Sequence, residues 1–302
     1  MTTAFRGLTT LAAALVSAMA TPAMADLPAP VRTMLDAAIA SGNDAEIAAV
    51  AKFAKSTNPA DSAEIDALVS AHRVAVAAAD EAHKRAAGFF QNWHGNGELG
   101  GFLTTGNSET SGITVGLALD KEGIDWRHKI RAIADYQRAD GVTTRNQWLA
   151  SYEPNYNVTA RLYTFGLAMY EKDRFQGFSD RVTLSGGMGY RVIDSDAMTL
   201  DIKGGPAWRR TDWIAEPSTS KFNGLAGADF VWHISPALDF SNNAQALWGD
   251  GNSTYSNTAA LTAKLSGALS GRLSYGVRHE TNPPAINEKT DTVTRATLVY
   301  GF

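Results

Sequence analysis

The feature that most constrains this chain is a strict alternation of apolar and polar residues that runs to its last residue. Within Thr294–Phe302, one face carries Leu298, Tyr300 and Phe302, and the other face begins with Arg295. A period of two residues is typical of a β-strand, whose side chains point alternately to opposite faces. A strand that ends a chain in this way can close a sheet on itself, with its apolar face toward lipid and its polar face toward a lumen.

Eleven earlier segments repeat this period and supply the other strands. In the segment 163–169, for example, Tyr163, Phe165, Leu167 and Met169 share one face, and we expect this apolar face to point outward to lipid. The sequence therefore predicts a mainly β fold, a transmembrane antiparallel β-barrel of about 12 strands, preceded by a small α-helical periplasmic segment. The earlier segments cover approximately residues 92–104, 112–119, 125–138, 148–156, 163–169, 181–192, 198–209, 222–234, 238–248, 259–266 and 272–278.

The connections between these segments alternate in length, as periplasmic turns and extracellular loops do. Five short ones are expected near 121–123, 154–158, 194–196, 235–236 and 266–269, and longer ones near 105–109, 139–144, 172–179, 210–221, 249–255 and 282–291. A soluble β-sandwich would share the alternation but not this difference in loop length. Aromatic residues near strand ends predict two interfacial girdles: Trp126, Tyr136, Trp148, Tyr190, Trp208 and Trp248.

Composition excludes several classes of protein. Apolar residues make up 44% of the chain and the mean hydropathy is −0.18, so a bundle of membrane helices is excluded. Cysteine is absent, which removes disulfides and thiol chemistry. The net charge is −4 and no basic block occurs, so nucleic acid is not expected as a partner. We expect no cofactor, because the G-x-G-x-x-G run at Gly95–Gly100 lies inside a predicted strand and does not open a helix. We expect no metal, because neither an H-E-x-x-H motif nor a histidine cluster occurs.

The N-terminus reads as a secretory signal. Arg6 precedes an apolar stretch from Leu8 to Ala18, and Ala23-Met24-Ala25 forms a cleavage site, so the mature chain is expected to start at Asp26. The predicted domains are thus residues 1–25 as signal peptide, 26–88 as a helical periplasmic segment, and 89–302 as an outer-membrane barrel.

Residues 28–87 are rich in alanine and show helical spacing. Breaks are expected at Ser41–Asp44 and at Asn58-Pro59, and Asp61–Glu64 offers a capping box for a third helix from Ala63 to about Ala86. Two interpretations remain open for this segment: a surface that binds a periplasmic partner, and a solvated spacer.

Three short motifs give the barrel region a family resemblance. They are a T-G-N-S-x-T turn around Gly106–Thr110, the run Tyr170–Phe175 with its D-R-F step, and Asn282-Pro283-Pro284 before the final strand. In this order, and with the terminal Phe302, they resemble the DUF481 family of salt-induced outer membrane proteins over roughly residues 90–302. The resemblance implies an outer-membrane barrel in a Gram-negative bacterium. It implies no catalytic residues, because the family has none established, and it does not extend to residues 28–87.

The polar faces of the strands carry the candidate functional residues, which we expect to line the lumen. Two hypotheses follow: a narrow solute or ion conduit lined by opposed charges, or a lumen closed by side-chain networks in a structural or envelope-stress protein. The predicted lumen-lining residues are Arg127, Lys129, Arg131, Asp135, Glu153, Arg181, Arg191, Asp201, Lys203, Arg209, Asp229 and Asp239.

Enzyme activity is not expected. Some outer-membrane barrels are lipid hydrolases, and His279 has the outward position that such an enzyme needs, but no serine motif accompanies it. Asp173 and Arg174 are expected to form an ion pair in their loop. The expected partners are outer-membrane lipid and lipopolysaccharide, and the barrel-assembly machinery, which would read Phe302.

Overall fold

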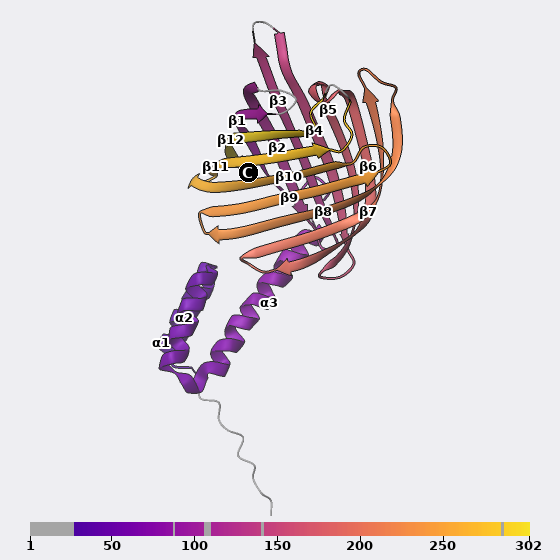
Figure 1. The fold of residues 1–302 in the computed structure, drawn as a ribbon. Coiled ribbons are helices and arrows are strands. Elements are labelled where there is room, and N and C mark those ends of the chain that lie inside the picture. The colour runs from indigo at the N-terminus through magenta and orange to yellow at the C-terminus, as the bar shows by residue number, and fades with distance from the viewer. Residues whose placement is uncertain (1–26, 87, 106–109, 140–141, 285–286) are drawn as a thin grey trace, which may run out of the picture. The chain divides into compact units, whose positions relative to one another are not determined.

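A closed ring of twelve antiparallel strands forms the C-terminal part of the computed structural model (Figure 1). The structure describes residues 27–86, 88–105, 110–139, 142–284 and 287–302, so the predicted signal and the turn at 106–109 lie outside the described residues. Each strand pairs with its neighbours in sequence, and the first pairs with the last. The strands are β1 Trp93–Thr105, β2 Thr110–Glu122, β3 Trp126–Ala139, β4 Val142–Asn157, β5 Leu162–Asp173, β6 Phe178–Asp194, β7 Met198–Trp213, β8 Thr219–Ser235, β9 Leu238–Gly249, β10 Thr254–Ser266, β11 Leu269–Glu280 and β12 Thr290–Gly301.

The last strand closes the barrel as its alternation predicted. β12 pairs antiparallel with β1, with Leu298 opposite Leu99. Beyond the end of β12, Phe302 and Gly95 exchange two backbone hydrogen bonds of 2.9 Å. The ring therefore leaves no free edge between its first and last strands, as a hydrocarbon environment requires.

The outside of the barrel is apolar. The apolar side chains of Leu99, Ile113, Leu273 and Leu298 are each more than half exposed. Aromatic side chains flank this band at both ends, because Trp126 and Tyr190 lie near one rim and the other four predicted girdle residues lie near the other rim. Such a surface, joined to a closed ring, is that of a barrel that spans a bilayer.

The two rims differ less in loop length than expected. One rim, here called the turn side, carries the connections 123–125, 158–161, 195–197, 236–237 and 267–268, and the opposite loop side carries the others. The predicted turn at 154–158 was wrong, because Pro154 lies inside β4. Proline has no N–H for the ladder, and pairing between β4 and β5 is interrupted at this point. On the loop side, most of 139–144 and both ends of 210–221 belong to strands.

The direction of β5 also differs from expectation. Tyr163, Phe165 and Leu167 are only 3%, 5% and 7% exposed, whereas the alternate residue Ala168 is exposed. The apolar face of β5 thus points into the barrel, where it packs on Leu225 and on residues of β7 and β9. The prediction that this face contacts lipid was wrong, because alternation fixes that a strand has two faces and not which one is inside.

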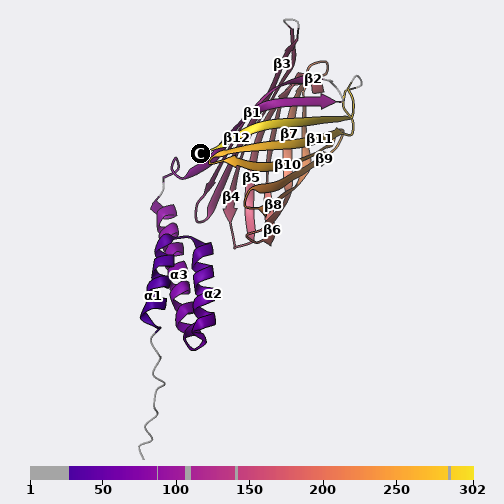
Figure 2. The same cartoon turned by 90° about the vertical axis from the view of Figure 1, so that its left-hand side faces the viewer.

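The helical part precedes the barrel and contains α1 Ala29–Ser41, α2 Asp44–Thr57 and α3 Ser62–Ala86 (Figure 2). By its internal contacts the chain divides into residues 1–80 and residues 81–302. The first unit has its own core, centred on Leu35, Ile47 and Ile65. None of the described helices is long and apolar enough to cross a membrane.

Local signals place these helices well, with one exception. Asn43 caps α2, since its side chain accepts hydrogen bonds from the N–H groups of Ala45 and Glu46. The capping box expected at Asp61–Glu64 is not used in that way. Instead, the Glu64 carboxylate accepts 3.0 Å bonds from the Leu27 N–H and from Arg32, and so ties the start of α1 to α3.

Candidate functional site

Ion pairs cross the inside of the barrel between strands that are not neighbours. The first group, here called the loop-side network, consists of Glu171, Arg181, Arg209, Arg278 and Glu280. Arg278 of β11 contacts Glu171 of β5 at 2.6 Å. These two strands are separated by five others in either direction around the ring, so this contact joins opposite walls of the lumen.

In the same network one carboxylate oxygen contacts two guanidinium groups, and several of the side chains are buried. Glu280 Oε1 lies 2.9 Å from Arg181 and 3.1 Å from Arg278. Arg181 is 1% exposed, and its guanidinium also stacks 3.9 Å from the centre of the Phe178 ring. Pairing and stacking compensate the cost of removing these charges from water.

A second group, the turn-side network, consists of Lys129, Glu153, Lys203 and Asp229. Lys203 Nζ lies 2.6 Å from Glu153 and 3.3 Å from Asp229, and Lys129 lies 3.8 Å from Asp229. Because β5 and β6 separate the strands of Glu153 and Lys203, this network too spans part of the lumen.

An apolar layer lies between the two networks. It combines Phe165 and Leu167 of β5 with Ala207, Leu225 and Leu247, all of them buried. The strand register places it there, since Lys203 and Arg209 flank Ala207 on the same face of β7. Charged, apolar and charged side chains thus follow one another along the barrel axis.

Most of the predicted lumen residues meet in these contacts. Arg127 and Arg191 both reach Asp201, at 3.5 and 3.0 Å. Asp135 pairs at 2.8 Å with Arg295, across β1 and β2.

Two predicted residues pair with a neighbouring strand. Arg131 pairs at 2.7 Å with Asp120 on the neighbouring strand β2. Asp239 contacts His233 at 2.6 Å on the neighbouring strand β8, where both are about half exposed.

Sequence reasoning missed four residues that take part in the bridging pairs: Glu171, Arg278, Glu280 and Arg295. Arg278 and Arg295 could have been found, because they occupy the polar face of their strands. Glu171 could not, since it shares the face of β5 that was expected to meet lipid.

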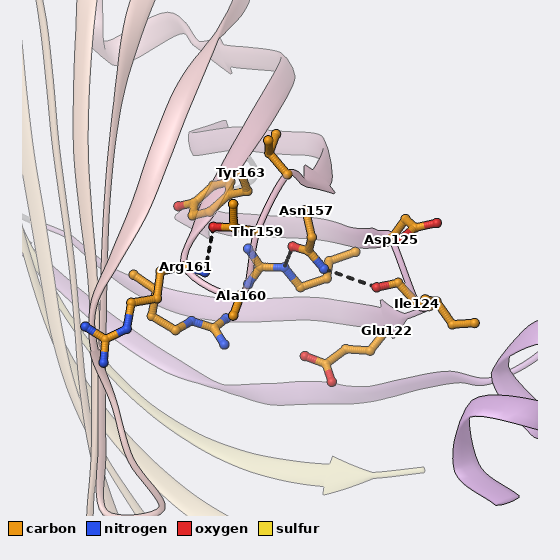
Figure 3. Close-up of a pocket in the computed structure, with 12 residues that line it drawn as sticks. Glu122, Ile124, Asp125, Asn157, Thr159, Ala160, Arg161 and Tyr163 are labelled. Atoms are coloured by element: carbon orange, nitrogen blue, oxygen red, sulfur yellow. Dashed lines mark hydrogen bonds between the residues drawn. The ribbon is translucent and has the colours of Figure 1, made fainter. Parts of the chain in front are cut away.

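Each end of the lumen opens into a cavity. On the turn side a cavity of about 400 Å³ is lined by residues of β2–β6 and their turns (Figure 3). There Asn157 accepts a 3.1 Å bond from Arg127 and donates to the Ile124 carbonyl. On the loop side a cavity of about 460 Å³ reaches down to Arg181 and Arg209. Two members of the loop-side network therefore line this second cavity.

The two loop-region expectations have different outcomes. His279 Nδ1 lies 2.8 Å from the Thr290 hydroxyl, and no hydrogen bond joins it to a serine in the part of the chain that the structure describes. Asp173 caps the turn 174–176 by accepting from the N–H groups of Phe175 and Gln176. The ion pair expected between Asp173 and Arg174 stays a prediction.

A closed ring of twelve strands with an apolar exterior and a charged interior defines a membrane-spanning β-barrel protein. The chain belongs to the family described as "Protein of unknown function, DUF481", whose model matches residues 97–302, so the predicted resemblance is confirmed.

One relative is the "Uncharacterized protein YdiY" of Escherichia coli (strain K12), which is 22% identical over 211 residues, 70% of this chain and 83% of YdiY. Solved structures that are similar include the NanC porin, at 8% identity, 68% and 98% coverage of the two chains and a TM-score of 0.48. An outer membrane channel from Pseudomonas putida F1 has 10% identity, 70% and 96% coverage and a TM-score of 0.46.

Proposed function

We propose that this protein is an outer-membrane β-barrel whose lumen is closed by its own side chains, with a structural or envelope-stress role rather than that of an open diffusion pore. One observation carries this proposal: Arg278 and Glu171 join opposite walls of the barrel at 2.6 Å, and Glu171 is 4% exposed. The apolar layer and the turn-side network support it, because each places a further obstacle on the same path.

The proposed location is the outer membrane of a Gram-negative bacterium, with the helical segment in the periplasm. The apolar exterior and the signal expected at residues 1–25 support it. Insertion would depend on the barrel-assembly machinery, which would read Phe302 at the end of β12, and the exterior would contact lipid and lipopolysaccharide. Residues 28–87 would then be available to a periplasmic partner.

A narrow conduit is the second candidate. It is favoured by the two cavities, of about 400 and 460 Å³, which open at opposite ends of the same lumen. A solute would pass between them only if the side-chain networks rearranged, and so the conduit would be gated.

Single-channel recording in planar lipid bilayers separates the two candidates. For the purified full chain we expect no discrete current steps, and regular steps would refute the closed barrel and favour the conduit. Replacing Glu171 and Arg278 together by alanine should increase the frequency of brief openings. The matched control replaces Arg210 and Asp212, an exposed pair on one strand that is 3.2 Å apart, and should leave the recording unchanged.

A further inference from the structure

Arg209 is a buried cation whose hydrogen-bond partners among the described residues are hydroxyls and not carboxylates. The residue is 8% exposed, and its guanidinium donates to two hydroxyls, Thr183 at 3.3 Å and Thr254 at 2.7 Å. A guanidinium has five N–H donors, so most of its hydrogen-bonding capacity is unused. Burial of a charge is costly unless it is paired, and hydroxyls compensate only part of that cost.

The carboxylates nearby are already engaged elsewhere. Glu171 contacts Arg278, and Glu280 is shared between Arg181 and Arg278. Asp173 is a third buried carboxylate beside this network, so Arg209 is distinguished by its hydroxyl partners and not by an excess of charge in the network as a whole. Arg209 also lines the loop-side cavity, as does Arg181.

A second cation lies next to Arg209 on the same wall. Lys221 of β8 is the direct cross-strand neighbour of Arg209, is exposed, and also lines the cavity. Like charges directly opposite each other destabilise a sheet. Their juxtaposition in a cavity of about 460 Å³, within the range of small-molecule sites, suggests that a bound anion offsets the repulsion.

The cavity is also lined by groups of a different chemistry. The carboxylates of Glu216 and Asp250 are exposed, and the ring of Trp213 is half-buried. Exposed carboxylates are well screened and accept hydrogen bonds from hydroxyl groups. An anion that also carries hydroxyl groups would match both the cations and the carboxylates that line the cavity.

We propose that the loop-side cavity binds a small hydroxylated anion, such as a sugar acid, whose carboxylate pairs with Arg209 and Lys221. Glu216 and Asp250 would accept hydrogen bonds from its hydroxyl groups. The proposal does not depend on whether the lumen conducts, because the cavity lies on the loop side of the network that closes it.

Isothermal titration calorimetry of the full chain in detergent at low salt tests this assignment, with glucuronate as the probe and glucose as the neutral control. We expect glucuronate to bind and glucose to bind at least about tenfold more weakly, because charge-assisted hydrogen bonds are the strong ones. Absence of glucuronate binding, or equal binding of the two sugars, would overturn the proposal.

Variants locate the site. Arg209→Met should weaken glucuronate binding at least about tenfold, whereas Arg210→Met, the next residue on the opposite face of β7, should have no effect. If Arg209→Met does not yield a heat-modifiable barrel, the exposed variant Lys221→Met decides, with an expected weakening of about threefold that fades at high salt. Wild-type affinity in the folded cationic-residue variants would show that the anion binds elsewhere.

Discussion

The contact between Glu171 and Arg278 gives the sharpest test of the closed lumen. At 2.6 Å and an effective dielectric constant near 20, two unit charges attract by about 6 kcal/mol before the cost of desolvation is subtracted. Replacing Arg278 by methionine removes the cation that contacts the buried Glu171 carboxylate, whose Oε2 already lacks a hydrogen-bond partner among the described residues. We therefore expect Arg278→Met to destabilise the barrel by about 3–5 kcal/mol.

The double variant distinguishes a coupled pair from two independent residues. Glu171→Leu alone leaves Arg278 with Glu280 as its remaining partner, so a smaller loss of about 1–3 kcal/mol is expected. In Glu171→Leu/Arg278→Met an apolar pair replaces the ion pair, and the loss should be about 2–3 kcal/mol smaller than the sum of the single losses.

Reversible urea unfolding in detergent or lipid, followed by tryptophan fluorescence, measures these free energies, and heat modifiability on gels confirms that each variant folds. The outward pair Arg210 and Asp212 serves as the control and should show no measurable coupling, since both side chains are exposed to solvent. Additive losses at Glu171 and Arg278 would refute the reasoning, because they would mean that the opposite walls are not joined.

Three further predictions concern other contacts. Gly189→Val should destabilise the barrel by about 1–3 kcal/mol in urea unfolding, because a Cβ at this position would lie 2.2 Å from the Tyr163 ring, whereas Gly97→Ala, with nothing within 4 Å, should be neutral. Deletion of Phe302 removes two backbone hydrogen bonds to β1 and should reduce the heat-modifiable barrel in outer-membrane fractions; unchanged amounts would argue against the terminal residue as an assembly signal. Glu64→Ala should lower the stability of the helical unit by about 1–2 kcal/mol in the helical circular dichroism signal of the full chain, and an unchanged melting curve would contradict a structural role for this carboxylate.

Local pattern was sufficient to predict the strands and the closure of the ring. A period of two residues is a property of a single strand, so Thr294–Phe302 could be placed as the closing strand without knowledge of its partner. Its predicted pairing with the first strand is confirmed. The girdle residues could be predicted for the same reason, since their position depends only on strand parity and on distance from a turn.

The partners across the lumen could not be predicted in this way. Whether Arg278 meets Glu171 depends on the tilt and stagger of all twelve strands. The stagger is the total of the register offsets between each pair of neighbouring strands. The register is irregular at several places, including the bulges between Gln137 and Arg138 and between Arg191 and Ile193. The total stagger cannot be derived from any short stretch of sequence. Charged residues could therefore be assigned to a face of their strand but not to a partner on another strand.

The orientation of β5 shows the same limit and leads to a direct test. Its apolar face was expected to meet lipid because lipid is the usual apolar surrounding of a barrel, yet in this barrel the lumen also contains an apolar layer. The chain has no cysteine, so single cysteines can report the two faces without background. In lipid vesicles, Ala168→Cys should react with a membrane-soluble maleimide, whereas Leu167→Cys, which is 7% exposed in the wild type, should be protected from it until the barrel is unfolded. The opposite labelling pattern would place Phe165 and Leu167 in the bilayer, remove the apolar layer from the lumen, and leave the ion pairs as the only closure.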